Sequence, residues 1–228
     1  MGVTQGSGPV TARLRTIGVA LPALVVATAL ALASSLGLPG CSWLDPGESV
    51  TVLGDSITAL GGPVMDEQLG PRYALEVDGQ FGATVADRLP AARDLAAGAP
   101  DQVVLNLGTN DVVHGGDLTD SVRNLDAMVA LFADARCVHV VTVNTNVRLD
   151  GESFPSRAEQ LNRAIEALPA AHPNVDVVRW DQMQQAAVDA GGSPTALTTD
   201  GVHPTDEGQR LLVAAYGDAL RKCPRKQQ

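Results

Sequence analysis

The chain of 228 residues has a formal net charge of −10, with 45% hydrophobic and only 3% aromatic residues. Apart from an N-terminal export segment, this length suits one domain with a sizeable core, and the composition makes that core mainly aliphatic. Because an acidic surface repels phosphate backbones and anionic lipid headgroups, we expect no nucleic-acid partner, and membrane contact only through the N-terminal segment.

Residues 1–40 have the pattern of a signal peptide or a membrane anchor. Arg13 and Arg15 precede an uncharged, mostly apolar run over residues 16–44, as in a positive region followed by a hydrophobic one. Residues 31–33 read Ala-Leu-Ala and fit a cleavage site. Alternatively, an uncleaved run of about 20 apolar residues suffices to span a bilayer.

A third alternative for the N-terminus is lipidation of Cys41. Residues 38–41 read Leu-Pro-Gly-Cys and resemble a bacterial lipobox, from which Pro39 departs. We therefore expect an exported protein that is either secreted or held at the cell envelope, with residues 41–48 as a linker.

From residue 49 onward, strand-like and helix-like segments alternate. Short apolar runs predict five strands, at residues 49–53, 73–77, 102–107, 138–143 and 175–180. Apolar residues at helical spacing predict helices at residues 84–97, 118–133, 157–168 and 205–222. Uninterrupted apolar strands suit a parallel sheet that is buried on both faces. We predict a three-layer α/β/α sandwich with a mainly parallel five-stranded sheet over residues 49–223, followed by a tail at residues 224–228.

Four short motifs follow the predicted strands or precede the last helix. They are Gly54-Asp55-Ser56, the turn that contains Gly82, Gly108-Thr109-Asn110-Asp111, and Asp200-Gly201-Val202-His203. The carboxyl ends of parallel strands meet at one edge of a sheet, where ligands bind in open α/β folds. The four motifs are therefore expected to converge on one site.

The residue types in these motifs suit nucleophilic catalysis. A serine hydroxyl becomes a good nucleophile only when a base removes its proton, so Ser56 is a candidate nucleophile and His203 its general base. Asp200, three residues before His203, can accept the Nδ1 proton and orient the ring, which leaves Nε2 to face Ser56. The backbone N–H groups of Ser56 and Gly82 and the side-chain amide of Asn110 are candidate oxyanion donors.

Together, the residues Ser56, Gly82, Asn110 and His203 resemble the four blocks of the SGNH hydrolase superfamily, the GDSL-like esterases. The resemblance covers residues 49–221, and Ile57 replaces the Leu of the namesake motif. It implies a flavodoxin-like sandwich and hydrolysis of small-molecule, lipid or glycan (thio)esters without metal or cofactor. The G-x-S-x-G motif of the α/β-hydrolases is absent from the sequence.

Two other functions remain open at this point. A sugar hydroxyl could replace water as the acyl acceptor, which would make the protein a cell-envelope O-acyltransferase with the same site. A non-catalytic envelope-binding module on a hydrolase fold is the alternative from a different class. Residues 59–72 and 145–156 are expected to be loops that form pocket walls, and neither the substrate's two halves nor an oligomeric state follows from the sequence.

The remaining chemistry-bearing residues are three cysteines and the other histidines. If Cys41 is lipidated, Cys137 and Cys223 remain as a pair, and export permits a disulfide between them. Such a bridge would stabilise the fold by ~4–5 kcal/mol in the chain-entropy model. His114, His139 and His172 lack metal-ligand spacing, so no metal site is predicted.

Overall fold

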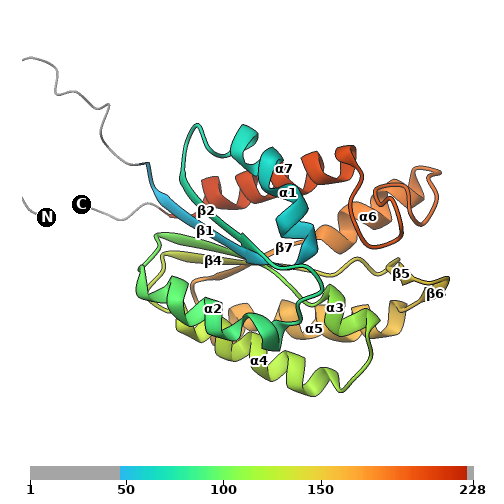
Figure 1. Ribbon diagram of the computed structural model, residues 1–228, viewed down its shortest axis with the longest axis horizontal. Coiled ribbons are helices and arrows are strands. Elements are labelled where there is room, and N and C mark those ends of the chain that lie inside the picture. The colour runs from blue at the N-terminus through green and yellow to red at the C-terminus, as the bar shows by residue number, and fades with distance from the viewer. Residues whose placement is uncertain (1–46, 225–228) are drawn as a thin grey trace, which may run out of the picture. The chain divides into compact units, whose positions relative to one another are not determined.

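A parallel five-stranded sheet forms the middle layer of residues 47–224, the part of the chain that the computed structural model describes (Figure 1). The strand order is β2-β1-β3-β4-β7, and every neighbouring pair is parallel. This order is that of flavodoxin-like doubly wound folds. The strands are β1 (Ser49–Gly54), β2 (Ala74–Gly79), β3 (Gln102–Asn106), β4 (Cys137–Val141) and β7 (Val175–Val178). The predicted five-stranded α/β fold is therefore confirmed.

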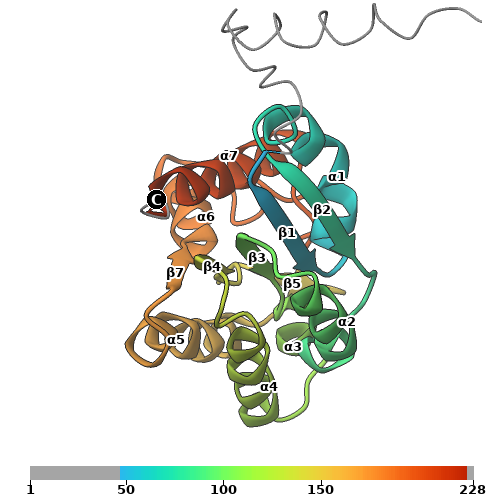
Figure 2. The ribbon, with the colours of Figure 1, turned by 90° about the vertical axis from the view of Figure 1, so that its left-hand side faces the viewer.

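Helices cover both faces of the sheet (Figure 2). On one face lie α1 (Ser56–Gln68), α6 (Trp180–Asp189) and α7 (Asp206–Lys222), and on the other α2 (Val85–Ala97), α4 (Leu118–Leu131) and α5 (Pro155–Ala171). The short α3 (Thr109–Val113) follows β3. Each face buries its own cluster of mainly Val, Leu and Ile side chains, as the scarcity of aromatic residues requires.

Burial of the strands follows their position in the sheet. All residues of β3 and β4 are buried, whereas β2 at the sheet edge has no buried residue, with Ala74 and Glu76 exposed and the others half-buried. Glu76 therefore fits in β2, because an edge strand has one side open to water. The weaker apolar pattern at residues 73–77 reflects an edge strand rather than a loop.

Two helices lie where the sequence suggested other structure. Residues 59–72 were expected to be a loop, but α1 continues to Gln68, because the Asp55 side chain caps its first turn and Ile57 and Met65 are buried against the sheet. The predicted strand at residues 175–180 ends at Val178, and Trp180 begins α6 with a buried ring. In the segment 145–156, a small antiparallel hairpin joins β5 (Arg148–Leu149) and β6 (Glu152–Ser153).

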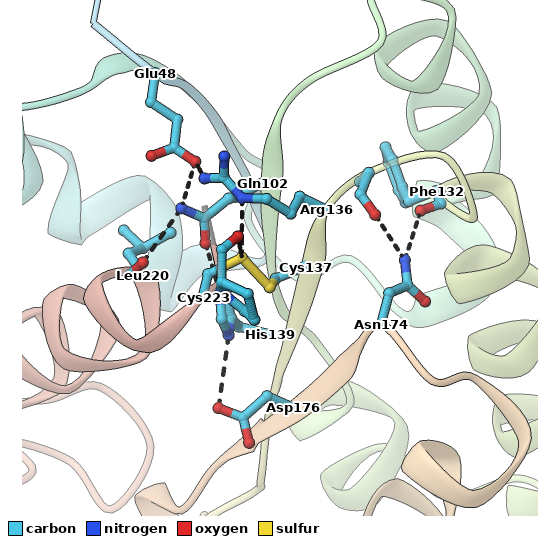
Figure 3. Close-up of a disulfide and its surroundings, with 12 residues drawn as sticks. Glu48, Gln102, Phe132, Arg136, Cys137, His139, Asn174, Asp176, Leu220 and Cys223 are labelled. Carbon is cyan, nitrogen blue, oxygen red and sulfur yellow. Dashed lines mark hydrogen bonds and ion pairs between the residues drawn. A yellow bond between two sulfur atoms is a disulfide. The ribbon is translucent and has the colours of Figure 1, made fainter. Parts of the chain in front are cut away.

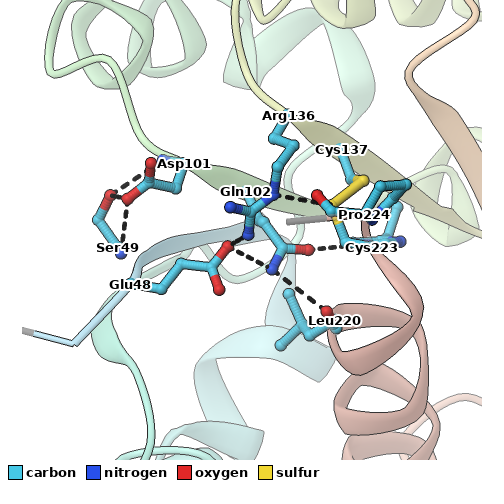
Figure 4. A network of polar contacts seen from close by, with 10 residues as sticks. Glu48, Ser49, Asp101, Gln102, Arg136, Cys137, Leu220, Cys223 and Pro224 are labelled. Carbon is cyan, nitrogen blue, oxygen red and sulfur yellow. Dashed lines mark hydrogen bonds and ion pairs between the residues drawn. A yellow bond between two sulfur atoms is a disulfide. The ribbon is translucent and has the colours of Figure 1, made fainter. Parts of the chain in front are cut away.

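At the amino-terminal edge of the sheet, a disulfide joins the start of β4 to the end of α7 (Figure 3). It links Cys137 and Cys223, the pair identified from cysteine parity, across 86 residues. Arg136 donates to Cys223 Sγ at 3.3 Å and forms an ion pair with Glu48 (Figure 4). The bridge therefore lies at the opposite end of the strands from the predicted site.

A buried polar chain runs beside this disulfide. Gln102 Nε2 donates to Glu48 Oε1 at 2.7 Å and to the Leu220 carbonyl at 3.3 Å, so Gln102 Oε1 is the acceptor for His139 Nε2 at 3.0 Å. His139 is therefore an Nε2–H tautomer, whose Nδ1 lies 3.8 Å from an Asp176 carboxylate oxygen. Burial lowers the pKa of His139 to about 4, although Asp176 opposes the shift. His139 thus has a structural role.

Within residues 47–224, no helix has the length and apolar character needed to cross a bilayer. The predicted export segment, its cleavage site and the lipidation site Cys41 lie outside the described residues.

Candidate active site

Ser56 stands at the junction of β1 and α1. β1 ends at Gly54, Asp55 is the N-cap residue whose Oδ1 accepts from the Ile57 N–H at 2.9 Å, and Ser56 is the first helical residue. Only glycine fits at position 54, since a Cβ there would overlap the Thr58 side chain and lie 2.7 Å from the Asn106 carbonyl oxygen. Because the first N–H groups of a helix have no intrahelical acceptor, the Ser56 N–H is available to a ligand.

His203 and Asp200 lie in one closed turn before α7. The Thr199 N–H donates to the His203 carbonyl at 2.8 Å, and a β-bridge joins Thr198 to Pro204. Asp200 Oδ1 accepts from the backbone N–H groups of Val202 and His203 at 2.9 and 2.7 Å. The turn therefore holds the carboxylate and the imidazole next to one another before any substrate is present.

Ser56, His203 and Asp200 form one chain of hydrogen bonds. His203 Nδ1 lies 2.7 Å from Asp200 Oδ2, and His203 Nε2 lies 2.9 Å from Ser56 Oγ. Desolvation raises the pKa of Asp200, but hydrogen bonds from the His203 ring and from the backbone N–H groups outweigh it and lower the pKa to about 2. An ionised Asp200 accepts the Nδ1 proton, so Nε2 is free to accept the proton of Ser56.

The three predicted oxyanion donors lie around the same edge of the sheet. Gly82 has φ +69°, a left-handed conformation that favours glycine and sets the direction of its N–H group. Asn110 Nδ2 donates to the Ala83 carbonyl at 3.0 Å and makes a longer contact of 3.4 Å with Asp55 Oδ2. Asn110 thereby ties the Gly82 turn to α3.

Two aspartates of the motifs make structural hydrogen bonds. Asp111 Oδ2 accepts from the Val85 N–H at 3.0 Å, which fixes the start of α2 directly after the Gly82 turn. Asp55 is buried beneath Ser56, and desolvation raises its pKa to about 7, against the Ile57 N–H bond and the charge of His203, which lower it. A carboxyl with this pKa is a titrating group inside the site, which the sequence did not indicate.

Two arginines that the sequence motifs do not indicate hold the site in place. Arg157 on α5 donates to the carbonyls of Val112 and Asp111 at 2.8 Å, and so holds α3. The Arg148 N–H on β5 donates to the Gly201 carbonyl at 3.1 Å, which anchors the turn that carries His203. No local motif marks either contact, because their partners lie more than 40 residues away in sequence.

Residues 52–211 match the model of a family described as GDSL-like lipase/acylhydrolase. A search of curated proteins finds no match. Among solved structures, the acetyl xylan esterase AlAXEase is similar, with 23% identity, a TM-score of 0.66, and coverage of 75% of this chain and 99% of that one.

Two further solved structures share the fold at similar distance. The lipase/acylhydrolase from Enterococcus faecalis has 21% identity and a TM-score of 0.63, covering 79% of this chain and 99% of that chain. Axe2, an acetylxylan esterase from Geobacillus stearothermophilus, has 20% identity and a TM-score of 0.64, covering 79% and 98%. The structural similarity covers nearly the whole of each of these two chains.

Proposed function

The chain belongs to the GDSL-like lipase/acylhydrolase family, and from this we propose that it is a serine esterase with Ser56, His203 and Asp200 as its catalytic triad. The observation that carries the proposal is the hydrogen-bond chain from Asp200 through both nitrogens of His203 to Ser56 Oγ. This arrangement couples a nucleophile to a base of fixed tautomer, which is what acyl transfer to serine requires.

In the acylation step, His203 Nε2 takes the proton of Ser56 as Oγ attacks the ester carbonyl carbon. The carbonyl oxygen becomes an oxyanion, which receives hydrogen bonds from the N–H groups of Ser56 and Gly82 and from the Asn110 amide. When the intermediate collapses, the C–O bond to the alcohol breaks, and the leaving oxygen takes the proton from His203. The product is an acyl-Ser56 ester and a free alcohol.

In the deacylation step, water replaces the alcohol. His203 takes a proton from the water as its oxygen attacks the acyl carbon, and the same donors hold the second oxyanion. Ser56 Oγ then leaves with the proton from His203, which releases a carboxylic acid and restores the free enzyme. The ionised Asp200 stabilises the imidazolium in both steps.

We propose acetylated glycans as the substrate class. AlAXEase and Axe2, which share the fold over 99% and 98% of their own chains, are both named as acetyl xylan esterases. Export is part of the proposal, since Arg13, Arg15 and the apolar run after them have the pattern of an export segment. The buried disulfide between Cys137 and Cys223 supports it, because such bonds persist mainly outside the cytosol.

The test compares the full-length protein with its Ser56→Ala variant on p-nitrophenyl esters from acetate to palmitate and on acetylated xylan. We expect hydrolysis that favours acetate, and a loss on the order of 10⁴-fold or more in kcat for the variant. The matched control is Ser193→Ala, which changes an exposed serine in the loop after α6 and should leave turnover unchanged. Labelling of the wild type by a fluorophosphonate should also require Ser56. A folded protein that neither hydrolyses these esters nor takes the label would contradict the proposal.

A further inference from the structure

A cavity of about 420 Å³ lies between α1 and α7, directly beside His203. Besides His203, its walls include Leu60, Val64, Thr199, Asp206, Gln209 and Arg210. Ser56, Gly82 and Asn110, the three proposed oxyanion donors, do not line it. The cavity is therefore separate from the donors that hold the carbonyl oxygen.

The imidazole of His203 connects this cavity to the reacting bond. Its Nε2 atom lies 2.9 Å from Ser56 Oγ, and the same ring forms part of the cavity wall. Leu60 follows Ser56 by one helical turn on α1, so the two residues share one face of the helix. An alcohol that leaves the acyl carbon on the side of His203 reaches the cavity along this face.

The direction of the reaction places one half of the substrate on that side. His203 gives its proton to the leaving oxygen, so the alcohol must lie against the imidazole during acylation. We infer that the cavity between α1 and α7 binds the alcohol half of the ester, and that this half is a polyhydroxylated ring. The inference rests on the proposed esterase function and adds the residues that select the leaving group.

The walls of the cavity match a sugar ring in polarity. Leu60, with 51% of its surface exposed, and Val64 offer an apolar surface for the C–H face of a ring. Asp206 accepts hydrogen bonds and Arg210 donates them, which suits hydroxyl groups that do both. Arg210 forms no ion pair with any residue in the range 47–224, so its guanidinium is free for a ligand.

Gln209 closes the inner wall of the cavity. Only 6% of this residue is exposed, and its Nε2 atom is buried without a hydrogen-bond partner among the described residues. This atom packs against Gly61 of α1, where a Cβ would lie 2.1 Å from it, so it is shielded from the cavity. The exposed charged side chains of the wall are Asp206 and Arg210. A long alkyl alcohol would leave both unmatched, so the cavity favours a carbohydrate over a fatty alcohol.

The kinetic test uses two substrates that share the acyl group and differ in the alcohol, p-nitrophenyl acetate and acetylated methyl β-xyloside. Both form the same acetyl-Ser56, so kcat/KM differs between them only through binding of the alcohol half and acylation. For Arg210→Met we expect roughly 10-fold lower kcat/KM on the xyloside ester, mainly through KM, and less than about twofold change on p-nitrophenyl acetate. Arg163→Met, which changes a 68% exposed side chain on α5, is the matched control and should alter neither.

A binding measurement keeps the inference testable apart from the esterase reaction. Methyl β-xyloside is titrated into the full-length Ser56→Ala protein, with and without Arg210→Met, and followed by calorimetry. Saturable binding that weakens about 10-fold in the double variant supports the site even if wild-type hydrolysis is absent. Absence of binding, an equal loss on both esters for Arg210→Met, or a preference for long-chain alcohol esters would overturn it.

Discussion

His203 Nε2 lies 2.9 Å from Ser56 Oγ although the two residues are 147 positions apart in the chain. The contact exists because α1, which begins at Ser56, packs beside α7, which follows the His203 turn, over the same buried cluster. Packing of two helices on one face of the sheet therefore brings the predicted nucleophile to its predicted base.

Replacing the carboxylate partner of His203 should disable the base without removing it. In Asp200→Asn, an amide replaces the acceptor that fixes the Nδ1–H tautomer, so Nε2 loses its lone pair toward Ser56 part of the time. We expect kcat on p-nitrophenyl acetate to fall on the order of 10³–10⁴-fold. Asp134→Asn, an exposed change after α4, serves as the control. A loss below about tenfold would show that Asp200 does not orient the base.

The side chain of Asn110 is expected to act in the transition state. Its amide lies beside the Gly82 turn and donates to Ala83, so Asn110→Ala removes both a candidate oxyanion donor and one structural bond. We expect kcat to decrease ~10²–10³-fold with a smaller change in KM. Thermal unfolding of the same variant measures the structural part. Normal turnover in a folded variant would exclude Asn110 from the oxyanion site.

Asp55 should make the protein less stable as the pH rises toward neutrality. Desolvation raises its pKa from 3.8 to about 7, so the folded state keeps a proton that the unfolded state releases above pH 3.8. The contribution of Asp55 to the free energy of unfolding is fully present below pH 3.8. It decreases by on the order of 4 kcal/mol as the pH rises from 3.8 to about 7. The free energy of unfolding is measured in urea for wild type and Asp55→Asn across this range. As the pH rises, the wild type should lose stability relative to Asp55→Asn. A difference that is constant with pH would mean that Asp55 is ionised throughout.

His139 should make the protein less stable as the pH falls, over a pH range that overlaps that of Asp55. Because burial lowers its pKa from 6.5 to about 4, the unfolded state takes up a proton first as the pH falls. The contribution of the neutral ring is complete above pH 6.5 and is lost toward pH 4, by about 3 kcal/mol.

The test for His139 is the variant His139→Gln, whose Nε2 can replace the donor to Gln102. Unfolding measured by urea should show that the variant keeps its stability between pH 6.5 and 4 better than wild type. The exposed His114→Gln, outside this network, is the comparison. Equal acid sensitivity of wild type and His139→Gln would assign the effect to other groups.

The disulfide should stabilise the fold without taking part in the reaction. The Cys137→Ser, Cys223→Ser double variant loses a cross-link that closes 86 residues, and we expect its free energy of unfolding to fall by ~4–5 kcal/mol. Its kcat under native conditions should stay near the wild-type value, since the bridge lies at the start of β4 and the end of α7. Urea unfolding with and without reductant measures the first effect. A large loss of kcat in the folded variant would show coupling along α7.

Local patterns in the sequence were sufficient to predict the sheet and to indicate candidate site residues. The buried strands β3 and β4 are apolar runs because both of their faces are covered, and that requirement is visible in any window of the chain. Ser56, Asn110, Asp200 and His203 stand out because hydroxyl, amide, carboxylate and imidazole groups follow strands or precede a helix in a recognisable order. Neither result depends on how distant segments pack.

Helices α1 and α6 do not follow from local sequence patterns, because they depend on how distant segments pack. Gly61, Gly62 and Pro63 weaken the helical pattern of α1, and its stability comes from the Asp55 cap and from burial of Met65. Trp180 extends the apolar pattern of β7 in sequence, but its ring packs in the cluster beneath α6. Tertiary burial decided both cases, because it outweighs local propensity.

Side-chain chemistry and short-range periodicity were enough to predict the α/β class, the five strands and the candidate residues for acyl transfer. The contact between Ser56 and His203, the raised pKa of Asp55 and the cavity between α1 and α7 arise only in the folded chain. Distances, desolvation and cavities arise where segments far apart in sequence meet, and no local window of the sequence contains both sides of such a contact.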